Sequence, residues 1–141
     1  MPKIFTIGFS GKGPDAFMDV LNAVRVRTVW DVRLWRISTY VPFYSGENLA
    51  TALGDRYEYH PEFAPTKEIL TEYKNGTISW ADYEKLYREL LAVRRPAVGA
   101  EPATFDRICL LCTEKSALQC HRRLAAEYIA SQFPDIDIVH L

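Results

Sequence analysis

The segment from Arg107 to Cys112, RICLLC, is a continuous apolar run that begins at a charged residue. A strand that is apolar on both faces is typical of the middle of a parallel sheet covered on both sides. Further strand-like segments alternate along the chain with segments of helical period, and they lie at residues 3–8, 27–32, 57–60 and 135–140. Such alternation implies parallel pairing through right-handed crossovers. We therefore predict one three-layer α/β domain over residues 1–141, with a mostly parallel sheet of four or five strands and helices on both faces.

The helical segments show apolar residues at the i, i+3, i+4, i+7 spacing of one buried stripe. Capping residues or a helix-compatible proline mark several of their starts. The predicted helices begin near Pro14, Asn48, Thr66, Ser79 and Gln119 or Cys120. The segment 33–43, RLWRISTYVPF, follows neither period and is predicted to be a loop. No internal repeat and no second domain are expected.

Composition excludes several classes of protein. The formal net charge is -1, which argues against strong, non-specific binding to nucleic acid, since that binding needs many basic side chains to neutralise phosphates. No apolar run approaches the roughly 18 to 20 residues of a membrane span, and no secretory segment is recognised. We expect a cytoplasmic protein without a membrane partner. The three cysteines are an odd number in a chain able to form its own core, so we expect reduced thiols. The oligomeric state stays open.

Residues able to carry chemistry follow the predicted strands. In open parallel sheets, ligands bind outside the carboxyl ends of the strands, where successive loops converge. The residues found at these ends are Gly8 and Ser10, Asp31 and Arg33, His60, and finally Cys112, Glu114, Cys120, His121 and Arg122. We expect them to cluster at one edge of the sheet and to form an active or binding site there.

The blocks TIGFS, WDVR with Ser38 and Phe43 downstream, APTKEIL and LLCTEKSALQCHR resemble the signature blocks of the domain-of-unknown-function 488 family. Together they span nearly the whole chain, and their joint order and spacing make the resemblance specific. It implies a bacterial or archaeal single-domain α/β protein and points to no established reaction. Two positions depart from the family pattern: Phe9, where many relatives carry His or Tyr, and residues 35–37, where proline is common before the Ser.

Each candidate residue has a second interpretation. Cys120 is expected at a helix amino terminus with arginines after it, which favours a thiolate nucleophile, although a small cysteine also packs well there. His121 lies in register with the apolar stripe of its helix, so it is either a general base or a core histidine. Glu114 is either an acid–base group or a helix cap. Asp31 and Arg33 form either a structural ion pair or part of an anion site.

Metal, phosphatase and redox chemistry are less favoured by the spacing of these residues. Cys112, Cys120 and His121 are potential zinc ligands, but a seven-residue gap followed by an adjacent Cys-His pair matches no compact zinc motif. Leu118 stands where a C-x5-R phosphatase loop needs arginine, and no C-x-x-C redox motif is present. No metal ligand and no cofactor are therefore assigned.

The leading hypothesis is an enzyme that binds a small anionic molecule, such as a nucleotide or a nucleic-acid end, and catalyses hydrolysis or group transfer. The candidate catalytic residues are Asp31, Glu114, Cys120 and His121. The candidate substrate-binding residues are Gly8, Ser10, Arg33, Ser38, Cys112 and Arg122, with the arginines as anion anchors. The alternatives are a non-catalytic nucleic-acid-binding or regulatory module that uses loop 33–44, and a thiol redox or metal-handling protein.

Overall fold

The computed structural model of the chain describes residues 2–141 and contains a five-stranded, all-parallel sheet. The strand order is β3-β2-β4-β1-β5, so the apolar strand β4 lies in the middle, as its sequence predicts. The strands are β1 (Lys3–Gly8), β2 (Thr28–Asp31), β3 (Tyr57–Tyr59), β4 (Ile108–Cys112) and β5 (Asp137–His140). The predicted fold class and the upper value of the predicted strand number are confirmed.

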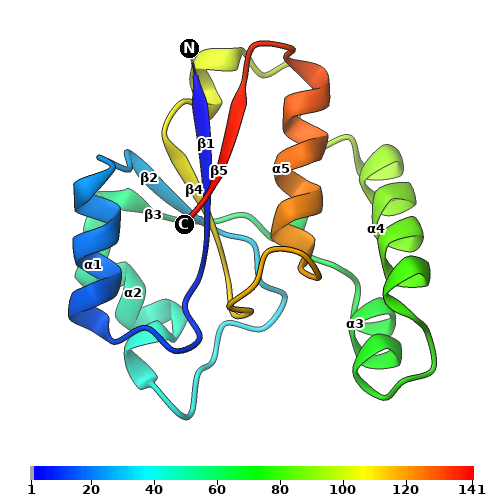
Figure 1. Ribbon diagram of the computed structural model, residues 1–141, viewed down its shortest axis with the longest axis horizontal. Helices are drawn as coiled ribbons and strands as arrows, with labels where there is room; N and C mark the ends of the chain where they lie inside the picture. Colours follow the sequence, from blue (N-terminus) through cyan, green and yellow to red (C-terminus); the bar gives the residue numbers. More distant parts are fainter. Residues whose placement is uncertain (1) are drawn as a thin grey trace.

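Helices cover both faces of this sheet, which makes the predicted three layers (Figure 1). One face carries α1 (Pro14–Ala23) and α2 (Gly46–Leu53). The other face carries α5 (His121–Gln132), which packs against β1, β4 and β5. The helix α4 (Trp80–Arg94) packs against α5, and α3 (Lys67–Lys74) packs against α4. Within residues 2–141, no helix is both long and apolar enough to cross a membrane.

The caps predicted from the sequence set the starts of two helices. The Thr66 side chain accepts a hydrogen bond from the backbone N–H of Ile69. Ser79 and Asp82 form a reciprocal capping box, in which each side chain accepts from the backbone N–H of the other residue. Because these bonds satisfy N–H groups that have no partner inside the helix, the local sequence is enough to fix both boundaries.

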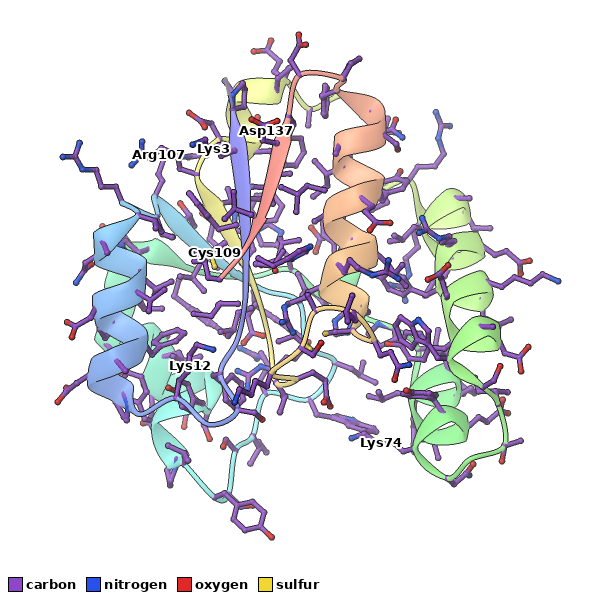
Figure 2. The ribbon with its side chains drawn as sticks, viewed as in Figure 1. Lys3, Lys12, Lys74, Arg107, Cys109 and Asp137 are labelled. Atoms are coloured by element: carbon purple, nitrogen blue, oxygen red, sulfur yellow. The ribbon has the colours of Figure 1, made fainter. Side chains whose placement is uncertain are left out.

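The alternation of side chains along β4 separates its two cysteines. Ile108 and Leu110 contribute to the core under α5, whereas Cys109 and Leu111 belong to the core under α1 and α2. Cys109 lies in the interior of the molecule (Figure 2) and is fully buried, as predicted for a core residue. Since successive residues of a strand point to opposite faces, Cys112 faces the α5 side. Cys109, Cys112 and Cys120 form no disulfide in the structure, and the expectation of reduced thiols stays a prediction.

The connections of the sheet create a crevice beside the end of β4. The chain leaves β1 and β2 toward the face covered by α1 and α2, and it leaves β4 toward α5 on the opposite face. The strand β4 lies between β2 and β1, so neighbouring loops diverge on both of its sides. Such a switch in direction is where open α/β sheets hold their ligands.

Candidate functional site

A pocket of about 310 Å³ opens at the carboxyl edge of the sheet, on the α5 side. Its inner wall is the end of β4 and the start of α5, and its outer walls are the loop after β2 and the helices α3 and α4. The pocket is lined by Arg33, Leu34, Trp35, Ile37, Pro65, Leu70, Tyr73, Lys74, Trp80, Tyr83, Cys112, Thr113, Glu114, Gln119, Cys120 and His121. Five residues predicted for the site therefore meet here: Arg33, Cys112, Glu114, Cys120 and His121.

Cys112 and His121 face each other at the inner wall of the pocket. Cys112 Sγ lies 3.7 Å from His121 Nδ1, and His121 Nε2 lies 2.7 Å from the carbonyl oxygen of Val32. Because a carbonyl oxygen only accepts hydrogen bonds, Nε2 carries the proton and donates it. In the neutral ring, Nδ1 then presents a lone pair toward Cys112. The imidazole is thus held in one tautomer and one orientation.

Cys120 is the N-cap residue of α5, close to the predicted helix start. A hydrogen bond from the Cys120 thiol lowers the pKa of Cys112, and backbone N–H groups of Glu114 and Thr113 act in the same direction against the effect of burial. The same bond to Cys112, together with burial, raises the pKa of Cys120 well above its usual value. The two thiols therefore form one coupled pair in which Cys112 is the more acidic member.

The sulfur atoms of Cys112 and Cys120 and one ring nitrogen of His121 lie within 4.8 Å of one another. The three side chains are 6%, 3% and 6% exposed, respectively, and all three line the pocket. Sequence spacing disfavours a metal site because a seven-residue gap followed by an adjacent Cys-His pair matches no compact zinc motif. The fold closes that gap, since the loop 113–119 returns the chain to the end of β4.

Arg33 and Asp31 form a buried ion pair, one of the two interpretations that the sequence allows. Arg33 Nε and Nη2 each donate to a different carboxylate oxygen at 2.8 Å, and Tyr57 adds a third donor at 2.6 Å. Asp31 is fully buried, and it does not line the pocket. The carboxylate accepts four hydrogen bonds once the backbone N–H of Arg33 is included, so its oxygen atoms are occupied.

Arg122 lies under the loop that follows β4 and is 1% exposed. Its Nη1 and Nη2 donate to the carbonyl oxygens of Glu114 and Lys115, at 2.5 and 3.2 Å, and its Nε donates to Thr6. Arg122 does not line the pocket. These contacts indicate that Arg122 holds the loop in place, a role that the sequence pattern does not distinguish from anion binding.

We expect Arg122→Met to destabilise the protein by about 2–4 kcal/mol, because the loop carbonyl oxygens that the buried guanidinium holds lose their charged donor. Urea denaturation of the purified chain measures the change. Arg123→Ala is the matched control: it removes the neighbouring arginine, which only pairs with Glu84 and Glu127 near the surface, and should cost no more than about 1 kcal/mol. Equal and small losses in both variants would contradict the structural role of Arg122.

The remaining predicted residues lie around the site without entering the pocket. Gly8 ends β1 beside Cys112, and the Ser10 backbone N–H donates to the Thr113 carbonyl oxygen. The Ser38 hydroxyl accepts a hydrogen bond from the backbone of Val41 within its own loop. His60 pairs with Glu58 and Glu62 and stacks on Trp30. Their predicted roles in binding stay predictions.

The part of the outer wall that α3 and α4 form was not predicted from the sequence. It is aromatic: Tyr73 and Trp80 pack edge to face with 5.7 Å between ring centroids, and Trp80 stacks on Tyr83 at 4.8 Å. At the rim, Lys74 Nζ lies 5.3 Å from the ring of Trp35, below the sheet edge in the view of Figure 2. The sequence marks three of these residues only as members of helix stripes, a pattern that equally describes core packing.

The position of the site can be compared with known families. A family model described as Domain of unknown function DUF488 matches residues 13–129. The chain belongs to this family. Every residue that lines the pocket lies inside the DUF488 match, whereas Gly8 and Ser10 precede it. No curated protein and no solved structure matches the sequence.

Proposed function

We propose that this DUF488 protein is an enzyme that binds a small anionic substrate in the pocket and catalyses hydrolysis or group transfer at Cys112, Cys120 and His121. One observation carries the proposal: three reactive side chains from two segments of the chain meet at the inner wall of a pocket instead of being sealed in the core. Reactive groups that converge in a concave site are the usual mark of a catalytic centre.

The charges and rings around this centre support an anionic, planar substrate. Arg33 and Lys74 both line the pocket, and the ion pair with Asp31 uses only the Nε and Nη2 atoms of Arg33. A phosphate or carboxylate group is the natural partner of these cations. The aromatic wall formed by Tyr73 and Trp80 offers stacking surface for a ring such as a nucleobase.

Roles within the site follow from which atoms are already engaged. His121 Nδ1 is the group positioned to accept a proton, since Nε2 is bonded to the Val32 carbonyl oxygen. Glu114 is exposed at the pocket and is the second candidate for proton transfer. We assign structural roles to Asp31 and Arg122, because their polar atoms are held by other parts of the chain.

Binding is tested by titrating the purified chain with inorganic phosphate, AMP and benzoate while following tryptophan fluorescence. We expect AMP to bind best, because it combines an anion with a stacking ring. Lys74→Ala should weaken binding about fivefold, the equivalent of about 1 kcal/mol for an exposed charge contact. Lys67→Ala, at the opposite end of α3 and outside the pocket, should leave binding unchanged.

Catalysis is tested in parallel with p-nitrophenyl acetate and p-nitrophenyl phosphate as chromogenic substrates. We expect release of p-nitrophenol from at least one of them, lowered by at least about 100-fold in His121→Gln, as is typical for the loss of an acid–base group. Absence of both anion binding and turnover would overturn the proposal.

The alternative of a non-catalytic nucleic-acid-binding module has weaker support. Trp35 and Tyr40 in loop 33–44 are exposed, Tyr40 completely, as a base-stacking surface requires. However, Arg33 is paired with Asp31, and the Arg36 guanidinium lies 3.8 Å from the ring centroid of Tyr59. Salt-dependent binding of a single-stranded oligonucleotide that is lost in Tyr40→Ala and retained in His121→Gln would favour this alternative.

A further inference from the structure

We propose that Cys112, Cys120 and His121 form a zinc site with three protein ligands and a fourth position open to the pocket. This inference rests on the proposed function, because it identifies the metal ion that the same catalytic centre would bind. The site would hold Zn²⁺ through two sulfur atoms and His121 Nδ1. With the metal bound, Nδ1 no longer accepts a proton, and Glu114 is the remaining candidate for proton transfer. The fourth position would take a water molecule or the anionic group of the substrate.

The first support is the spacing of the donor atoms. In a tetrahedral zinc site with bonds of about 2.3 Å to sulfur and about 2.0 Å to nitrogen, these two ligand atoms lie roughly 3.5 Å apart. Cys112 Sγ and His121 Nδ1 are 3.7 Å apart, and all three donors lie within 4.8 Å. Small side-chain movements would therefore bring the three atoms into zinc geometry.

The second support is the orientation of His121. A histidine that ligates a metal through one nitrogen usually donates its other N–H to a carboxylate or a backbone carbonyl oxygen. His121 Nε2 makes this bond to the Val32 oxygen at 2.7 Å. The bond directs Nδ1 toward Cys112 and fixes the tautomer that a metal requires. This contact comes from the end of β2, far from His121 along the chain.

The third support is the incomplete ligand set. Among residues 2–141, no fourth cysteine, histidine or carboxylate belongs to the group. Asp31, the acidic residue of β2, is occupied by Arg33 and Tyr57. Structural zinc sites are closed by four protein ligands, whereas catalytic sites keep one position for water or substrate. The open side of this group faces the pocket, as a catalytic site requires.

The experiment uses the full, untagged chain after reduction and removal of metal with a chelator. Titration with Co²⁺ under anaerobic conditions should give one bound ion per chain, a thiolate-to-cobalt charge-transfer band and the intense visible bands of tetrahedral cobalt. Added Zn²⁺ should displace the cobalt and abolish these bands. Elemental analysis of the chain reloaded with Zn²⁺ should give one zinc ion per chain.

Variants assign the ligands. Cys112→Ser, Cys120→Ser and His121→Gln should each weaken Co²⁺ binding by more than about 100-fold, beyond the 10- to 100-fold loss typical of residues that only hold a ligand in place by a hydrogen bond. Cys109→Ala is the matched control, because this cysteine belongs to β4 and faces the opposite side of the sheet. Circular dichroism checks the fold of each variant. If a variant unfolds, the charge-transfer band of the unaltered chain still tests for thiolate ligands.

Two results would overturn the inference. One is a reduced chain that binds neither Co²⁺ nor Zn²⁺ at equimolar concentration. The other is a cobalt spectrum without a thiolate band, or one unchanged in all three ligand variants. A chain that binds no metal could still form a disulfide between Cys112 and Cys120 in air. That result would indicate that the two thiols are a redox pair and not zinc ligands. AMP binding that persists without metal binding would leave the proposed function standing, so the two failures are distinguishable.

Discussion

Gly8→Ala should prevent the chain from reaching a stable fold or lower its stability by at least about 3 kcal/mol. A Cβ atom at Gly8 would lie 1.5 Å from the carbonyl oxygen of Glu114 and 2.9 Å from Arg122 Nη1. The oxygen belongs to the backbone of the loop that Arg122 holds, so neither group can move away without breaking the hydrogen bond between them. Urea denaturation, or the soluble yield where the variant does not fold, measures the effect.

Gly13→Ala is the matched control for this prediction. It changes a glycine only five residues away, at a position where an added Cβ meets no atom within 4 Å and where φ is negative. We expect a change below about 1 kcal/mol, the size of an N-cap preference. If Gly8→Ala were as mild as this control, the close approach of β1 to the loop after β4 would be wrong.

Asp31→Asn should destabilise the protein by about 3–5 kcal/mol. The substitution keeps the shape of the side chain and removes its charge, which leaves the guanidinium of Arg33 buried without a counterion. Both side chains are nearly inaccessible, at 4% and 0% exposed for Arg33 and Asp31, so water replaces the lost partner poorly. A loss of this size is a large part of the total stability of a typical domain. Thermal and urea unfolding of the purified variant measure it.

Glu84→Gln controls for the loss of charge alone. Glu84 pairs with Arg88 and Arg123 at the surface of α4, where we expect a change of no more than about 1 kcal/mol. An Asp31→Asn variant that is as stable as Glu84→Gln but fails to turn over substrate would contradict the structural assignment. Asp31 would then return to the list of catalytic candidates.

The fold could be predicted because its signals are local. The apolar run of β4, the caps at Thr66 and Ser79 and the alternation of strands with helices each act over a few residues. The predicted helix near Asn48 begins two residues earlier, at Gly46, and the last strand begins at Asp137. Shifts of this size are usual, because helix and strand ends are weakly determined.

The members of the site could be predicted in part, and their roles less well. Parallel topology brings the strand ends to one edge, which correctly placed Cys112, Cys120 and His121 together. The roles depend on which face each side chain takes and on its nearest partner. Asp31 and Arg122 show why the roles are harder to predict. Asp31 accepts hydrogen bonds from Arg33, and Arg122 donates to carbonyl oxygens of the loop after β4. Nothing in the residue types distinguishes these contacts from substrate binding.

The aromatic wall could not be predicted for a different reason. Tyr73, Trp80 and Tyr83 lie on α3 and α4, which reach the site through helix packing rather than through a strand end. Their spacing along the helices is that of a buried stripe, and part of that stripe is indeed core. Only the three-dimensional arrangement shows that the same rings also line the pocket.

The proposed catalytic centre requires that Cys112 and Cys120 meet at an open pocket, and treatment of the reduced, folded chain with dibromobimane tests this directly. The reagent links two thiols that lie close together and are accessible. Mass spectrometry of the digested product should show one cross-link, between Cys112 and Cys120, with Cys109 unmodified because its side chain is buried on the opposite face of the sheet. A product in which Cys109 reacts as fast as the others, or in which no cross-link forms, would contradict the account.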